Sequence, residues 1–177
     1  MLLLTEAGIQ DFKTIQEIAY KSWPSTYGSI LSKEQIDYML DLFYSEKTLL
    51  ENFNEKGHRF LLVNEGELCL GFASYEHNYL NENCTRLHKI YLLPEAQGKG
   101  AGKLLIDTIE NLAKQNQSTT ISLNVNKFNK AISFYQKIGF EVVSEEDILL
   151  DHGYKMDEDI LSDHGYKMED YKMEKKL

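Results

Sequence analysis

The first third of the chain carries apolar residues at helical spacing. Phe12, Ile15 and Ile18 recur every three positions, which predicts an amphipathic helix over residues 10–21 that ends before Pro24. Two more helices are expected to follow. Ser32-Lys33-Glu34-Gln35 has the capping-box pattern that opens a helix, and a short helical piece is expected over residues 46–53.

The rest of the chain has the signals of strands, a glycine-rich loop and two further helices. Residues 59–64 and 68–79 predict a hairpin that turns at Gly66. Helical periodicity covers residues 103–114, and Asn129 and Gly139 suit the start and the end of a last helix. The expected strands are residues 2–5, 59–64, 68–79, 87–93, 121–125 and one from 140 onward. The order of these elements predicts an α/β fold.

The C-terminal tail contains a near-exact duplication. The sequence EDILLDHGYKM at residues 146–156 recurs as EDILSDHGYKM at residues 158–168, and a shorter echo, DYKM, follows at 170–173. The period of 12 residues is too short for a solenoid. The two copies compete for one strand register. His152 and His164 recur with their repeat, and no ligand cluster of suitable spacing surrounds them, so we do not interpret them as metal ligands.

Composition limits the class of protein. A chain of 177 residues is one domain by length, and its two cysteines, Cys69 and Cys84, occur without a secretory leader, which favours a cytoplasmic location. No apolar run approaches the ~20 residues that span a bilayer. The formal charge of −9 argues against nucleic-acid binding and is compatible with a cationic small substrate. Much of the acidity lies in residues 141–174, so the charge says little about a pocket.

Residues 87–102, LHKIYLLPEAQGKGAG, predict a strand, a tight glycine loop and the start of a helix. Such a loop gathers backbone N–H groups around one point and favours phosphate as a ligand. A Walker loop requires Ser or Thr where Leu104 stands, and the dinucleotide fingerprint requires glycine where Lys103 stands. Neither motif is present. The pattern that does fit is Q-x-x-G-x-G at Gln97, Gly100 and Gly102.

This pattern resembles the acetyl-CoA loop of the GNAT superfamily of N-acetyltransferases. A second stretch at residues 129–140, NKAISFYQKIGF, resembles that superfamily's signature N-x-x-A-x-x-F-Y-x-x-x-G-F. The resemblance implies a single domain over residues 1–177, with a mostly antiparallel central sheet of about seven strands that splays between strands four and five. It also implies that one copy of the repeat completes a closing hairpin, for which we expect the last strand at residues 166–175.

Acetyl-CoA is the co-substrate that the resemblance implies. Backbone N–H groups of the loop and of the following helix would hold its pyrophosphate, and a free N–H near Leu92 would polarise the thioester oxygen. Asn129 matches a residue that contacts the CoA arm in relatives, although a helix-capping role alone explains it. The expected cofactor-binding residues are Ile90, Tyr91, Leu92, Leu93, Gln97, Gly98, Lys99, Gly100, Ala101, Gly102, Lys103, Asn129 and Tyr135.

The resemblance also suggests catalytic groups, each with a simpler alternative. Tyr135 matches the tyrosine that protonates the departing thiolate, whereas packing on a buried helix face would explain it equally well without the motif. The general base is expected among Glu76, His77 and His88, with His88 and Glu76 preferred, against the alternative of ordinary strand residues. No metal is required.

The acceptor site is predicted less specifically. Trp23 and Tyr27, in the segment after the first helix, either pack in the core or form a wall of the acceptor groove, as the corresponding segment does in relatives. The whole pattern looks most like bacterial enzymes that acetylate polyamines and other small amines, so acetyl-CoA-dependent N-acetylation of a polyamine-like amine is the expected function. The alternatives are a peptide or protein amino group, a non-catalytic acyl-CoA sensor, and an interaction protein that uses the repeated tail. The resemblance also implies a homodimer.

Overall fold

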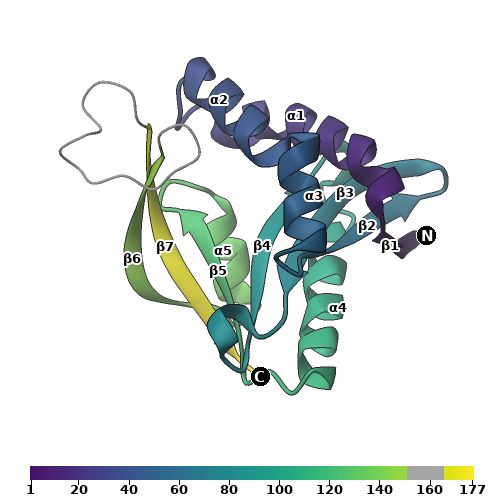
Figure 1. Ribbon diagram of the computed structural model, residues 1–177, viewed down its shortest axis with the longest axis vertical. Helices are drawn as coiled ribbons and strands as arrows, with labels where there is room; N and C mark the ends of the chain where they lie inside the picture. The colour runs from purple at the N-terminus through teal and green to yellow at the C-terminus, as the bar shows by residue number, and fades with distance from the viewer. Residues whose placement is uncertain (151–165) are drawn as a thin grey trace.

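A seven-stranded mixed sheet forms the centre of the molecule in the computed structural model, which describes residues 1–150 and 166–177 (Figure 1). The strands are β1 (Leu2–Ala7), β2 (Arg59–Glu65), β3 (Leu68–Glu76), β4 (Cys84–Leu92), β5 (Thr120–Asn126), β6 (Glu141–Leu150) and β7 (Tyr166–Lys176). The helices are α1 (Phe12–Tyr27), α2 (Lys33–Tyr44), α3 (Glu46–Asn54), α4 (Ala101–Gln115) and α5 (Ala131–Lys137). Single turns of 3₁₀ helix are η1 (Ile9–Asp11), η2 (Tyr79–Asn81) and η3 (Pro94–Ala96).

The strand order is β1-β2-β3-β4-β5-β7-β6, and every neighbouring pair is antiparallel except β4 and β5. The parallel pair is short, because residues 84–87 pair with residues 120–123 and the pairing stops there. Beyond it the two halves of the sheet diverge, as Figure 1 shows. The expected splay between strands four and five is therefore confirmed, and it leaves a gap in the middle of the sheet.

Each face of the sheet is covered by its own hydrophobic core. Helices α1, α2 and α3 pack on one face, where Phe72 and Leu40 are buried. Helix α4 covers the other face together with α5, and Leu70 and Leu105 are buried there. Because successive side chains of a strand point to opposite faces, neighbouring residues such as Leu61 and Leu62 enter different cores.

The first helix is longer than the sequence predicts. The expected stop at Pro24 is wrong, since α1 continues through Pro24 to Tyr27. Proline in a helix interior costs about 3 kcal/mol, but the last turn buries Trp23 and Tyr27 against the sheet, with exposed fractions of 3% and 6%. Their burial outweighs the local penalty. The segment of residues 23–27 is therefore helical and not a loop.

The helix and turn signals predicted at Ser32 and Gly66 are confirmed. The Ser32 hydroxyl accepts a hydrogen bond from the Gln35 amide at 3.1 Å and caps α2. Gly66, at a φ of 61°, turns the hairpin between β2 and β3. Strand β3 ends at Glu76, three residues before the expected end, because the backbone turns into η2 through Asn78, which has a φ of 54°.

The closing hairpin uses both copies of the repeat. The first copy supplies the end of β6, the second copy supplies the start of β7, and Leu150 pairs with Tyr166. The last strand expected at residues 166–175 is confirmed as β7. His152, His164 and the rest of residues 151–165 lie outside the described part of the chain. Within the described part, no helix combines the length and the apolar character that are needed to cross a membrane.

Candidate active site

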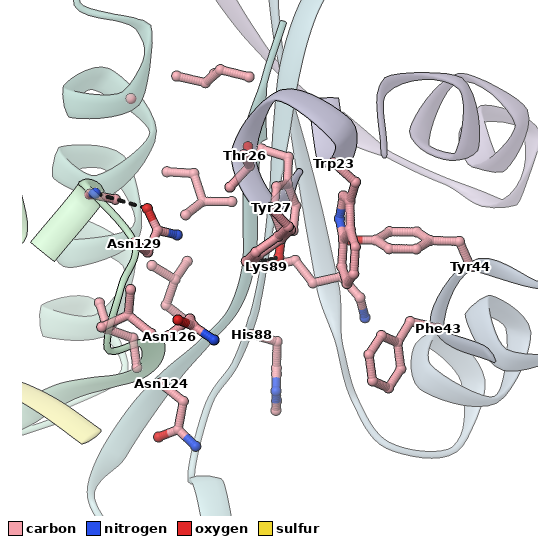
Figure 2. A pocket seen from close by; sticks show the side chains of 18 of the residues that line it. Trp23, Thr26, Tyr27, Phe43, Tyr44, His88, Lys89, Asn124, Asn126 and Asn129 are labelled. Carbon is pink, nitrogen blue, oxygen red and sulfur yellow. Dashed lines mark hydrogen bonds between the residues drawn. The ribbon is translucent and has the colours of Figure 1, made fainter. Parts of the chain in front are cut away.

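A groove of about 1650 Å³ occupies the gap where β4 and β5 diverge (Figure 2). Its walls come from α1, α2, α3, β4, the glycine loop, β5, α5 and β7. Pockets that hold one small ligand measure about 300–1,000 Å³. The groove is therefore large enough for a long ligand together with a second, smaller one.

The glycine loop forms one end of this groove. Gly98 and Gly100 have φ angles of 76° and 77°, and a Cβ added at either position would have nothing within 4 Å, so the main chain lies open there. At Gly102 a Cβ would meet Leu92 at 3.3 Å and Phe134 at 3.6 Å, so glycine allows α4 to approach β4 and α5 closely. The first amides of α4, which starts at Ala101, lack intrahelical partners and are suited to an anionic group.

Most of the loop residues expected to bind the cofactor line the groove. They are Gln97, Gly98, Gly100, Ala101, Gly102 and Lys103. Lys99 is the exception, because it is not part of the lining and its ammonium pairs with the Glu65 carboxylate. The sequence pattern cannot separate Lys99 from its neighbours, since the partner Glu65 lies 34 residues away in the chain.

Strand β4 presents backbone groups to the gap. Ile90, Tyr91, Leu92 and Leu93 all line the groove. The Leu93 amide donates to the Leu70 carbonyl of β3 at 2.8 Å. Because amides alternate in direction along a strand, the Leu92 amide points to the opposite side, toward the gap. The register between β3 and β4 shifts at His88, which places a bulge in β4 two residues before Ile90.

Tyr135 and Asn129 reach the groove from the α5 region. Tyr135 is 6% exposed, lies in the core under α4 and also lines the groove. Burial raises the pKa of its phenol, so the group stays protonated at neutral pH. The N-cap of α5 is Lys130 and not Asn129, but Asn129 Oδ1 accepts a hydrogen bond from the Ala131 amide at 2.9 Å and Asn129 also lines the groove (Figure 2).

The aromatic segment packs in the core and also borders the groove, and contact of its residues with an acceptor stays a prediction. Trp23 and Tyr27 are buried in the core and also line the groove, with their ring centroids 4.7 Å apart. The Tyr27 and Tyr91 hydroxyls hydrogen-bond to each other at 2.9 Å. Burial raises the pKa of Tyr27 to about 12. These rings make a rigid, uncharged wall opposite α5.

Two of the three candidate bases meet in the groove. His88 Nε2 lies 2.7 Å from Glu76 Oε2, and both residues line the groove. His77 is excluded from the groove wall, since its Nδ1 hydrogen-bonds with the Thr85 hydroxyl at 2.8 Å. Burial raises the pKa of Glu76. Burial, together with His58 and the cations nearby, holds the pKa of His88 well below its usual range, so its imidazole is neutral.

His58, which the sequence does not single out, completes this cluster. Its ring stacks on that of His88 with centroids 3.9 Å apart and planes 12° apart, and its Nε2 lies 3.6 Å from Glu76 Oε2. Burial lowers the pKa of His58 to about 3. The contacts join residues 18 to 30 positions apart in the sequence, so no local pattern marks them.

The geometry of the cluster bears on metal binding. The ligand atoms of His58, Glu76 and His88 lie within 4.8 Å of one another. A metal bonds in the plane of an imidazole at about 2.1 Å, and two stacked rings with centroids 3.9 Å apart and planes only 12° apart share no such point. One ring would have to rotate before both could bind the same ion.

Lys89 and Asp170 also line the groove, and no sequence pattern indicates this for either residue. Lys89 follows His88 at the bulge, and its Nζ lies 5.6 Å from the centre of the Tyr44 ring. Burial and Lys56 lower the pKa of Lys89 to about 8. Asp170 of β7 is 5% exposed and stands on the opposite wall. The alternation of side chains along β7 predicts that Asp170 and Met168 share one face of the sheet. It does not predict that this face borders a groove.

The family follows from comparison with known proteins. The model of the acetyltransferase (GNAT) family matches residues 12–140, a stretch that includes the glycine loop and α5. This chain belongs to the GNAT family. A spermidine N(1)-acetyltransferase of Thermoplasma acidophilum is 28% identical over 86% of this chain and 97% of its own length. The uncharacterised N-acetyltransferase YuaI of Bacillus subtilis is 31% identical over 83% of this chain and 84% of its own.

Solved GNAT structures agree. The PaiA N-acetyltransferase of Thermoplasma acidophilum, solved in complex with coenzyme A, matches with a TM-score of 0.78 and 27% identity over 100% of this chain and 99% of its own. A GCN5-related N-acetyltransferase of Rhodopseudomonas palustris matches in fold with a TM-score of 0.79 at 18% identity, over 99% of this chain and 95% of its own. The GNAT fold expected from the sequence is confirmed, and the chain is an acyltransferase that uses acetyl-CoA.

Proposed function

We propose that this GNAT enzyme transfers the acetyl group of acetyl-CoA to a primary amine of a small, polyamine-like molecule, by direct attack within a ternary complex. The continuity of the groove carries the proposal. A single cavity joins the glycine loop, the open edge of β4, Tyr135 and the cluster of His58, Glu76 and His88. Cofactor and acceptor can therefore meet inside it.

The residues of the groove supply each step of the reaction. The loop amides and the start of α4 hold the pyrophosphate, and the Leu92 amide donates to the thioester oxygen as the tetrahedral intermediate forms. The amine loses its proton to the His88–Glu76 pair, and its lone pair attacks the thioester carbon. As the C–S bond breaks, the Tyr135 hydroxyl gives its proton to the CoA thiolate, and the second proton that leaves the nitrogen as the amide forms restores the Tyr135 hydroxyl. The products are the N-acetylated amine and CoA.

An amino group on a protein is the second candidate acceptor. The [ribosomal protein bS18]-alanine N-acetyltransferase of Haemophilus influenzae is 36% identical over 92 residues, which are 51% of this chain and 61% of its own. The match covers a shorter part of the chain than that of the spermidine enzyme. A small amine is for this reason the first candidate.

Thiol release from acetyl-CoA tests the proposal. The assay uses a panel of spermidine, spermine, short peptides with free N-termini, and aminoglycosides. CoA release that depends on the polyamines, with a single acetyl group added to the amine by mass spectrometry, is the expected result. Release with peptides alone would assign the second candidate. Acetyl-CoA binding without release for any amine would favour a sensor.

A further inference from the structure

One wall of the groove carries a buried carboxylate with an unused oxygen. Asp170 lines the groove from β7, and its Oδ1 has no hydrogen-bond partner among the described residues. The two cations that lower the pKa of Asp170, Arg86 and Lys127, have partners of their own. The Arg86 guanidinium donates to the Ser122 hydroxyl at 3.2 Å, and Lys127 pairs with Glu145 at 2.9 Å. A buried acceptor without a donor is costly, so this oxygen is expected to serve a ligand.

A second unused oxygen lies on the same wall. Asn124 of β5 lines the groove, and its Oδ1 is likewise buried without a partner among the described residues. Its Nδ2 donates to Glu146 Oε2 at 3.0 Å. That contact fixes the amide orientation, because a flipped amide would set two acceptors against each other. The oxygen of Asn124 is therefore the atom left for the groove.

The sheet register places these two residues on the same face of the sheet. Asn126 pairs with Asp170 and Asn124 pairs with Lys172, so Asn124 and Asp170 are diagonal neighbours on one face. Figure 2 shows Asn124 and Asn126 side by side on this wall, across the groove from the aromatic rings of α1. One negative charge and two acceptors without a donor call for a cation that carries several N–H groups. An ammonium group has three.

We propose that Asp170 and Asn124 form a binding site for a second, non-reacting ammonium group of the acceptor. A carboxylate and an amide oxygen around an ammonium stabilise its charged form. The reacting amine needs the opposite, since it must lose its proton before it attacks. The site therefore holds the tail of a diamine or polyamine while its other amine reaches the thioester. This inference rests on the proposed function and adds the selection of dications over monocations.

The test compares 1,4-diaminobutane with butan-1-amine, which has the same carbon chain and one charge. The wild-type enzyme is expected to show a kcat/KM about tenfold or more higher for the diamine, mainly through KM, because a charge-assisted contact is at stake. Asp170→Asn should remove most of this preference and leave the kcat/KM for the monoamine within about threefold. Asn124→Ala should also reduce the preference for the diamine, but by a smaller factor than Asp170→Asn.

Glu174→Gln is the matched control. Glu174 lies on the same strand and face as Asp170, pairs with Lys172 at 3.1 Å and does not line the groove. It should leave the preference for the diamine unchanged. Acetyl-CoA affinity, measured by calorimetry, confirms that each variant is folded; if Asp170→Asn fails this check, Asn124→Ala decides. An equal preference in the wild type and in the folded variants would overturn the inference.

Binding without turnover separates this inference from the proposed function. Calorimetry of 1,4-diaminobutane against the enzyme–CoA complex measures the site directly. If no amine is acetylated but the diamine binds and Asp170→Asn weakens that binding about tenfold or more, the proposed function is wrong and the ammonium site stands. If the wild-type complex does not bind the diamine, the site is wrong.

Discussion

Among single residues, Asp170 has a carboxyl group whose pKa folding raises. Burial raises the pKa of its carboxyl group from 3.8 to about 6, with Glu146 acting in the same direction. Between those two pH values the unfolded chain has lost this proton while the folded protein still holds it, so stability falls as the pH rises. Above pH 6 the folded state bears the full cost of the buried charge, about 3 kcal/mol from the shift in pKa.

Asp170→Asn should therefore stabilise the protein at neutral pH and not in acid. We expect the free energy of unfolding to rise by about 1–3 kcal/mol at pH 7 and to change little at pH 4. Urea denaturation at the two pH values measures the difference. A variant that is less stable than the wild type at pH 7 would show that the carboxylate is satisfied within the fold.

Tyr135→Phe removes one hydroxyl and keeps the ring in the core. Because the thiolate then leaves without a proton donor, kcat should fall about a hundredfold, while acetyl-CoA affinity and stability change little. Steady-state kinetics and calorimetry give both quantities. Tyr171→Phe is the control, since Tyr171 packs in the same core and does not line the groove. Equal losses in the two variants would point to packing and not to proton transfer.

The sequence identifies the site most specifically where its residues form a local pattern. Gln97, Gly100 and Gly102 fall within six positions, and Tyr135 falls within a twelve-residue signature, so the sequence identifies them. His58 and Asp170 are far apart in the chain and come to the groove through sheet pairing. Their single side chains carry no signal that distinguishes them from other buried or surface residues.

At the scale of elements, local signals predicted the strands and most helices, and packing overrode them at one place. The cap of α2 at Ser32 is a contact between residues three apart, which a sequence pattern can encode. The passage of α1 through Pro24 depends on Phe43 and Tyr91, whose rings lie 6.2 Å and 5.6 Å from that of Trp23. These partners are distant in sequence, so a proline rule alone gave the wrong end.

The glycine loop gives a prediction at this scale. Gly100→Ala forces a left-handed residue to carry a Cβ, which should cost about 1–2 kcal/mol, and it places that Cβ where a phosphate would approach. Acetyl-CoA affinity should fall about tenfold or more. Gly57→Ala is the control, because Gly57 has a φ of 71°, open space around it and no place in the groove lining. If both variants bind acetyl-CoA alike, the loop does not hold the cofactor.

For the molecule as a whole, the duplicated tail lengthens one hairpin without changing its register. Leu150 pairs with Tyr166, so 15 residues join β6 to β7. Removing residues 151–162 would leave Leu150 followed by Asp163-His164-Gly165 and then Tyr166. The same two strands would then be joined by a three-residue loop with glycine at its end, a common hairpin connection.

This deletion should stabilise the protein by about 1 kcal/mol, because a shorter loop costs less entropy to close. Acetyl-CoA affinity should be unchanged. Urea denaturation and calorimetry measure the two effects, and a chain with residues 151–162 in scrambled order controls for loop length. A large loss of stability that the deletion and the scrambled chain share would show that the inserted copy makes contacts of its own.

The four residue pairs between β4 and β5 have a mechanical consequence. This short pairing joins the two halves of the sheet, and a cofactor that lies in the gap would contact both halves and hold them together. In native-state hydrogen exchange, the amides of residues 120–123 should open more readily than those of β2 in the free enzyme. Acetyl-CoA at a hundred times its Kd adds about 2.7 kcal/mol to global stability. The protection of the amides of residues 120–123 against exchange should then approach that of the β2 amides.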